Sequence, residues 1–164
     1  DDRQVRQFLL QFTLVDVAEV SEVMEAHEAD PGKRLAQRRL ADEVTTLVHG
    51  PDQAATAAGV SALLFGADPT TASESELSAA AREVASTTAD LSDGGADVVD
   101  LLVDLALVKS KGEARRAIDQ GGVYLNGQRV AAGSKLLDSD LLHGRYAMVR
   151  KGKRDYGVVV ATPR

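Results

Sequence analysis

Residues 109–130 read KSKGEARRAIDQGGVYLNGQRV and carry the densest set of local structural signals in the chain. Ser110, followed three residues later by Glu113, forms a capping box, in which two side chains satisfy free backbone amides. This pattern predicts that a helix begins at Lys111. The glycine pair 121–122 predicts its end, because glycine adopts the left-handed conformation that closes many helices. The stretch is therefore expected to begin with a short helix, with the capping box at its start and the glycine pair at its end.

This helix should separate apolar from basic side chains. Its apolar stripe is formed by Ala114, Ala117 and Ile118. Arg116 points away from the stripe, and Lys111 and Arg115, one turn apart, flank it. Residues 123–125 then alternate as a short strand, and the Asn-Gly pair at 126–127 is the strongest two-residue signal for a tight hairpin. The sequence thus predicts cations beside a small sheet.

The order of these elements resembles a small RNA-binding module first known from a ribosomal small-subunit protein, called S-four-like here. Its Ser-Lys, Ala-Arg-Arg, Gly-Gly-Val and Asn-Gly groups all fall at the spacing of that family. One departure is Lys111, where the module commonly has arginine, because lysine keeps the charge but lacks the bidentate fork. The alternative for Arg115 is a surface pair with Asp119, worth at most a few tenths of a kcal/mol.

A second hairpin is predicted at residues 145–161, with a basic turn at 151–154. Basic residues at a hairpin tip often serve only solubility or edge protection. Because this tip accompanies the S-four-like motif, we expect it to contact RNA. The candidate RNA-binding residues of this part of the chain are Lys109, Ser110, Lys111, Arg115, Arg116, Tyr124, Asn126, Arg129, Lys151, Lys153 and Arg154.

The distribution of charge favours an RNA partner although the total charge does not. The chain has 19 basic and 25 acidic residues, a net charge of −6. Residues 1–66 carry −5, residues 67–97 carry −6, and residues 98–164 carry +5. Polyanion binding depends on such local patches, because phosphate contacts are short-ranged and screened by salt. A basic face can also be a solvated surface without a partner. The S-four-like motif within this face favours RNA binding instead.

The first 66 residues predict a bundle of helices with short connections. Phe8, Leu9 and Phe12 recur at helical spacing, and Asp16 with Glu19 predicts a second capping box. The Asp-Pro pair at 30–31 predicts that a third helix begins at Pro31 and runs to about His49. An alanine-rich helix should follow and end near Phe65 and Gly66.

The third helix holds a second, weaker group of RNA-binding candidates: Lys33, Arg34, Arg38 and Arg39. Arg34 and Arg38 lie one turn apart on the face opposite the apolar stripe. The alternative is that Arg38 pairs with Asp42, and Arg39 with Glu43, at i,i+4. Such pairs are worth only about 0.2–0.5 kcal/mol, so stability alone does not account for the cluster.

Residues 67–97 are predicted to be an acidic linker with one helix, from the capping box of Ser73 and Glu76 to about Ser86. Asp97 should then cap an apolar helix that leads into the motif. The expected fold is α+β: a helical domain at 1–66, the linker at 67–97, and an S-four-like domain with β-hairpins at 98–164. A hinge of this composition predicts loosely coupled domains.

Residues 30–50 read DPGKRLAQRRLADEVTTLVHG and resemble the helical anticodon-binding domain of bacterial tyrosyl-tRNA synthetases. In that family an acidic linker and an S-four-like domain follow, which is the order seen here. The resemblance implies a C-terminal tRNA-binding region that recognises the anticodon region, anticodon stem and long variable arm of tyrosine tRNA. It also implies that a separate N-terminal domain uses ATP for aminoacylation and forms the homodimer. The fragment itself is then expected to be a cytoplasmic monomer without a cofactor.

No catalytic motif is found in this chain, which we expect to be inactive alone. The nucleotide-binding motifs of the family are missing, there is no glycine-rich phosphate loop, and the three histidines lack partners at metal or triad spacing. The first residue is not methionine, so the chain is expected to be a piece of a longer protein. No segment predicts a membrane span. Two alternatives are an S-four-like protein acting on ribosomal RNA in modification or rescue, and a protein-interaction module.

Overall fold

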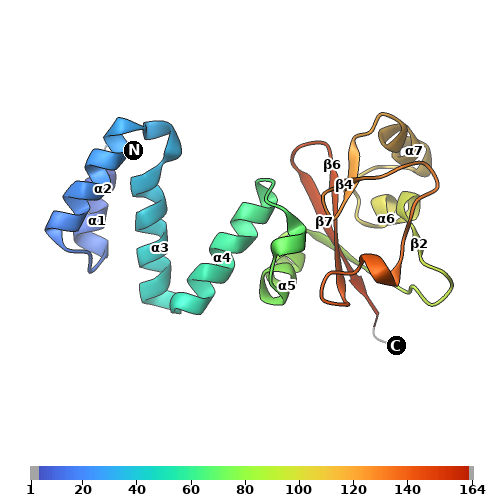
Figure 1. Ribbon diagram of the computed structural model, residues 1–164, viewed down its shortest axis with the longest axis horizontal. Helices are drawn as coiled ribbons and strands as arrows, with labels where there is room; N and C mark the ends of the chain where they lie inside the picture. The colour runs from blue at the N-terminus through green and yellow to red at the C-terminus, as the bar shows by residue number, and fades with distance from the viewer. Residues whose placement is uncertain (1–3, 163–164) are drawn as a thin grey trace. The chain divides into compact units, whose positions relative to one another are not determined.

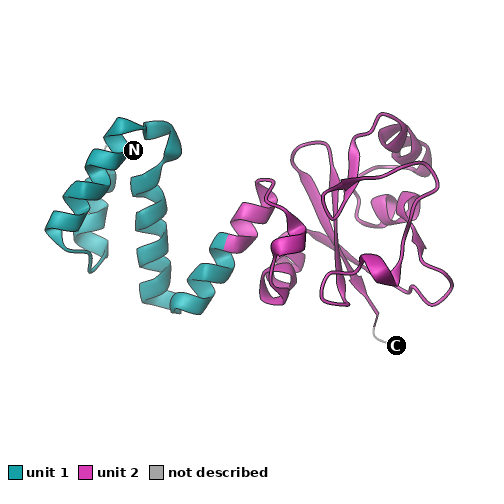
Figure 2. Ribbon diagram, in the orientation of Figure 1, with its two compact units in different colours: residues 1–58 teal, residues 59–164 magenta. Residues whose placement is uncertain are grey.

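The computed structural model describes residues 4–162, which divide into two compact units, residues 1–58 and 59–164 (Figures 1 and 2). The boundary falls within helix α4 (Pro51–Leu64), in the alanine-rich segment that the sequence predicts to be helical. Each unit has its own buried core. No helix among the described residues is both long and apolar enough to cross a membrane.

The first unit is built from α1 (Val5–Phe12), α2 (Val17–Ala29), α3 (Leu35–His49) and the first part of α4. Its core cluster of buried side chains consists of Val5, Leu9, Val20 and Ala36. Asp16 caps α2 as predicted, since its carboxylate accepts a hydrogen bond of 2.8 Å from the Ala18 amide. Glu19 does not complete a capping box and instead pairs with Arg39 at 2.6 Å.

The predicted start of the third helix at Pro31 is wrong by four residues. Residues Pro31–Lys33 form a short 3₁₀ turn (η2), in which the Arg34 amide bonds to the Pro31 carbonyl at 3.0 Å. Arg34 then adopts the left-handed conformation, with φ of 52°, and α3 begins at Leu35. Proline can begin either kind of turn, so the Asp-Pro signal alone did not distinguish them.

The second unit contains a five-stranded sheet in the order β1-β7-β6-β3-β4. Its strands are β1 (Ala85–Ala89), β3 (Val123–Leu125), β4 (Gln128–Arg129), β6 (Tyr146–Lys151) and β7 (Asp155–Ala161). Strand β1 is parallel to β7, and all other pairs are antiparallel. A small second sheet pairs β2 (Ala96–Asp97) with β5 (Lys135–Leu136), and two 3₁₀ turns are η3 (Pro69–Thr71) and η4 (Asp138–Asp140). The expected α+β class is confirmed.

Helices cover both faces of this sheet (Figure 1). On one face α6 (Val98–Asp104) and α7 (Lys111–Asp119) pack against Ala147, Val149 and Val159. On the other face α5 (Glu74–Glu83) and the end of α4 pack against Met148 and Val158. Strands β6 and β7 are therefore buried on both sides.

The segment 67–97, expected to be a linker with one helix, is instead part of this second unit. Its helix α5 has the predicted capping box at Ser73, but it ends at Glu83. Residues 85–89 then form edge strand β1, which pairs with residues 157–161 of β7. The sequence of β1, ASTTA, has little apolar character, so its pairing partner decides its conformation. The boundaries at 66/67 and 97/98 accordingly differ from the boundary at 58/59.

Candidate RNA interface

Helix α7 begins and ends where its sequence predicts. The Ser110 hydroxyl accepts a hydrogen bond from the Glu113 amide at 3.3 Å, and the Glu113 carboxylate accepts one from the Lys109 amide at 3.0 Å. Ala114 and Ile118 are buried against the sheet. This anchoring leaves Lys111, Arg115 and Arg116 exposed along the outer side of the helix.

Lys151 does not extend freely from its hairpin. Its Nζ donates to the Leu107 carbonyl at 2.8 Å and lies 3.1 Å from Glu113 Oε1. The hydrogen bond from the Lys109 amide, followed by the one from Lys151, lowers the pKa of Glu113 below its ordinary value. Lys151, a predicted RNA contact, is thus engaged within the protein, and it ties the β6–β7 hairpin to the start of α7.

The exposed cations of α7 differ in how they are paired. Lys111 Nζ lies 2.6 Å from the Asp100 carboxylate, and both side chains are about half exposed. Exposed pairs of this kind contribute about 0–1 kcal/mol, so a phosphate can replace the carboxylate at small cost. Within residues 4–162, Arg115 and Arg116 form no ion pair, and the alternative contact between Arg115 and Asp119 is not made. Their charge is available to a ligand.

On the sheet face opposite α6 and α7, two arginines flank Tyr124. Register places Tyr124 between Arg129 on β4 and Arg150 on β6. The Arg150 guanidinium carbon lies 4.0 Å from the centre of the Tyr124 ring, a cation–π contact. Hydrogen bonding from Arg129 and its positive charge, then the charge of Arg150, lower the pKa of the Tyr124 phenol. We call Arg129, Tyr124 and Arg150 the arginine–tyrosine row.

Arg150 was missed by the sequence analysis. It lies on an alternating strand and has no motif of its own, so only the pairing of β3 with β6 brings it to Tyr124. Arg129, by contrast, is confirmed as part of the hairpin beside α7. A Cβ atom on Gly121 would lie 3.0 Å from the Arg129 guanidinium, and Gly121 itself has φ of 68°. The left-handed backbone at the helix end favours glycine there, and a side chain would also crowd the Arg129 guanidinium.

Asn126 is buried, and both polar atoms of its side chain bond within the protein, which argues against the predicted RNA contact. It adopts a left-handed conformation with φ of 46°, as the predicted tight turn requires. Its Nδ2 donates to the Asp140 carbonyl at 2.6 Å, and its Oδ1 accepts from the Met148 amide at 2.8 Å. Asn126 holds the β3–β4 hairpin to its neighbours.

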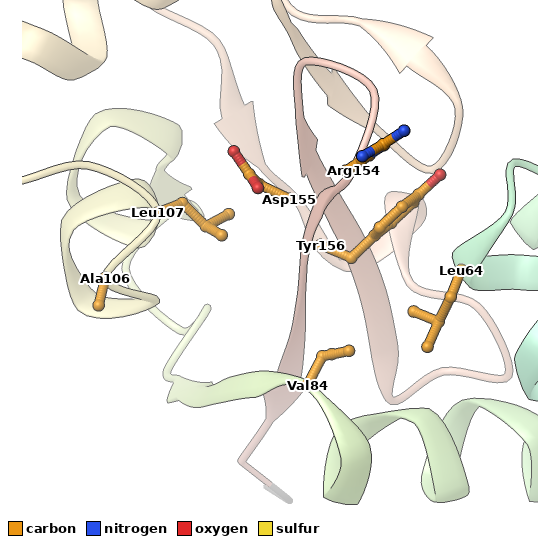
Figure 3. Close-up of a pocket in the computed structure, with 7 residues that line it drawn as sticks. All are labelled: Leu64, Val84, Ala106, Leu107, Arg154, Asp155 and Tyr156. Carbon is orange, nitrogen blue, oxygen red and sulfur yellow. The ribbon is translucent and has the colours of Figure 1, made fainter.

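The tip of the β6–β7 hairpin carries Lys153 and Arg154, both exposed. Figure 3 shows Arg154 and Tyr156 on the same side of β7, with Asp155 on the other. An open cavity of about 480 Å³ lies here. It is lined by these three residues and by the apolar side chains of Leu64, Val84, Ala106 and Leu107. The tip therefore presents two exposed cations on the same hairpin that Lys151 joins to the start of α7.

In the first unit two of the four candidate cations, Lys33 and Arg39, pair with acidic side chains. Lys33 pairs with Asp30 at 3.1 Å, and Arg39 pairs with Glu19 at 2.6 Å and with Glu43 at 2.8 Å. The expected pair of Arg39 with Glu43 is therefore present, and Arg34 also has an interaction of its own. Arg38 is exposed, and no pair with Asp42 is seen within residues 4–162.

Helix, hairpin and sheet together define a small α+β domain with a basic surface on one helix and a row of arginines around a tyrosine. Residues 76–159 match the family model described as the tyrosine–tRNA ligase SYY-like C-terminal domain. The chain belongs to this family.

Similar proteins are consistent with this membership. A tyrosine–tRNA ligase of Anaeromyxobacter dehalogenans (strain 2CP-1) is 43% identical over 162 residues, which cover 97% of this chain and 39% of the relative. One of Streptomyces avermitilis is 42% identical over 164 residues, covering 99% and 38%. The chain thus spans less than two fifths of the length of these relatives. A solution structure of a tyrosyl-tRNA synthetase C-terminal domain is 29% identical, with a TM-score of 0.47, and covers 60% of this chain and 98% of its own.

Proposed function

We propose that this chain is the tRNA-binding C-terminal region of a tyrosine–tRNA ligase and that it binds tyrosine tRNA. The observation that carries the proposal is the pair Arg115 and Arg116, exposed on α7 without an ion pair among residues 4–162, in a domain of this family. A planar guanidinium grips two phosphate oxygens at once and stays charged at any physiological pH.

In this proposal the second unit binds the anticodon stem and the long variable arm through α7, the arginine–tyrosine row and the hairpin tip. Binding releases counterions from the phosphates, so affinity falls steeply with salt. Arg38 is the candidate of the first unit best placed to meet the anticodon region, since it is exposed and no ion pair of it is seen within residues 4–162. The aminoacylation chemistry, the use of ATP and the homodimer contacts are assigned to the part of the relatives that this chain does not span. The isolated chain is then a monomer that acts in the cytoplasm.

A role in binding ribosomal RNA is less well supported. It accounts for an S-four-like domain but not for the helical unit before it. The similarity to tyrosine–tRNA ligases covers 97–99% of the chain and so includes that unit.

A gel-shift experiment with two RNAs tests the proposal. We expect the chain to bind a tyrosine tRNA with a long variable arm more tightly than a tRNA with a short one. We expect the affinity to fall with salt at a slope of about −0.7 to −0.9 per neutralised phosphate. Equal affinity for both tRNAs would remove the variable arm from the proposal, and tighter binding to a ribosomal RNA fragment would favour the alternative.

A further inference from the structure

The second unit has a cavity that the phosphate contacts of α7 do not use. It lies on the sheet face opposite α6 and α7, beside the arginine–tyrosine row, and has a volume of about 260 Å³. Its lining includes the buried side chains of Met148 and Tyr156 and the partly exposed Arg150. The turn at residues 66–69 and the tip of the β3–β4 hairpin complete the lining.

The walls of this cavity are held in place by the protein itself. A Cβ atom on Gly127 would lie 3.6 Å from Pro69 Cδ and 3.9 Å from Asp68 Oδ1, so the hairpin tip packs against the turn. Asn126 fixes the same hairpin through its bonds to Asp140 and Met148. The cavity is smaller than the roughly 300–1,000 Å³ typical of sites for drug-sized ligands. Its size suits a single planar ring system.

The lining of the cavity includes one carboxylate, Asp68, and one guanidinium, Arg150. Asp68 Oδ1 accepts hydrogen bonds from the Thr70 amide at 2.9 Å and hydroxyl at 2.8 Å, and no partner of Oδ2 is seen within residues 4–162. These bonds lower the pKa of Asp68, so it is an anion at neutral pH. Arg150 donates through one nitrogen to the Gly152 carbonyl at 3.0 Å and stacks on Tyr124.

A carboxylate disfavours phosphate at this place, because like charges repel. A nucleobase edge, in contrast, offers donors and acceptors together. Guanine has two adjacent N–H donors that suit a carboxylate, and its O6 and N7 are the acceptors that arginine binds most often. Unpaired bases in RNA are commonly read in this way, with their ring faces against aromatic or guanidinium planes.

We propose that this cavity binds an unpaired guanine base of the RNA, with Asp68 accepting from its N–H edge, Arg150 donating to its acceptor edge, and Tyr156 and Met148 contacting its ring. The proposal rests on the proposed RNA-binding function and adds a base-specific contact to it. Adenine lacks the second adjacent donor, uracil lacks the amino group, and cytosine does not fill the cavity.

The binding of mononucleotides to the full chain, followed by NMR, tests the site directly. We expect GMP to shift the Gly127 amide and the Met148 methyl resonance at lower concentration than AMP, CMP or UMP. Ribose 5-phosphate should leave both resonances unchanged. Equal effects of all four nucleotides would show that the cavity does not select guanine, and an effect of ribose 5-phosphate as large as that of GMP would reveal phosphate binding only. Either result would overturn the proposal.

The variant Asp68→Asn removes the negative charge but keeps the structural role of this side chain, since the amide oxygen can still accept hydrogen bonds from Thr70. We expect it to weaken GMP binding about 5- to 150-fold, the range for one bidentate base contact. The control Asp93→Asn, which changes an exposed carboxylate away from the cavity, should have no effect. Unchanged GMP binding in Asp68→Asn would refute the site. Tyrosine tRNA binding by the parent chain, measured separately, tests the proposed function: tRNA binding without a GMP site would support that function alone, and absence of tRNA binding would contradict it.

Discussion

At the residue scale, the side chains near the motif divide into those that hold the domain together and those that remain available to a ligand. Lys151 and Asn126 belong to the first group, because their polar atoms bond within the protein. Arg115 and Arg116 belong to the second. The sequence showed which residue types were present, but which charges were already satisfied depended on contacts between residues far apart in the chain.

The double variant Arg115→Ala/Arg116→Ala should lose tRNA affinity without losing stability. We expect a cost of about 1–3 kcal/mol in binding, the range for hydrogen bonds to charged groups. The slope of the logarithm of affinity against the logarithm of salt concentration should become shallower by roughly one to two units. Arg82→Ala, at an exposed position of α5, is the matched control and should bind as the parent chain does. Unchanged affinity in the folded double variant would place the main RNA contact at the Lys153–Arg154 tip.

Asn126→Ala should destabilise the second unit, because it leaves a buried amide and a buried carbonyl without partners. The expected loss is about 1–3 kcal/mol of unfolding free energy, and the left-handed backbone at this position adds to it. Thermal unfolding followed by circular dichroism measures the effect. Gln128→Ala, at the exposed neighbouring strand position, should change stability by less than about 0.5 kcal/mol. Equal stability of the two variants would contradict the structural role of Asn126.

At the element scale, α7 and its hairpin were predictable because each boundary is marked by adjacent residues. The Ser110 cap, the glycine pair and the Asn-Gly turn act over three or four residues, and all three are present in the structure. Strand β1 was not predictable, since ASTTA becomes a strand only through its pairing with β7, some 70 residues away. Arg150 was missed for the same reason.

The contact of Glu113 with Lys151 joins two elements and should make their packing depend on pH. Because the pKa of folded Glu113 lies below its ordinary value of 4.5, its contribution to stability is present above that pH. It is lost as the pH falls through the lower, folded pKa. We expect Glu113→Gln to melt at a lower temperature than the parent chain at pH 7, and the difference to shrink towards pH 3. A difference that stays constant over this range would show that the charge of Glu113 does not contribute to stability.

At the scale of the whole molecule, the boundary between the two compact units falls within α4, and the second unit includes α5 and β1. Leu77 and Ala80 of α5 are fully buried against the sheet, and β1 covers one edge of β7. A fragment that begins at residue 98 lacks these elements and would expose Met148 and Val158, which are buried in the intact unit.

We therefore expect the fragment 59–164 to fold on its own and the fragment 98–164 to remain poorly ordered, as judged by the dispersion of their amide spectra. Exposing one whole face of the central strands removes burial worth about 25 cal/mol for each Å² of apolar surface, and a domain has only about 5–15 kcal/mol of net stability.

The fragment 59–164 should also keep most of the tRNA affinity and its salt dependence, because it contains both arginines of α7 and the arginine–tyrosine row. A well-dispersed spectrum from 98–164 would show that α5 and β1 are dispensable. Weak binding by a folded 59–164 would instead move the principal RNA contact to the helical unit and its exposed Arg38.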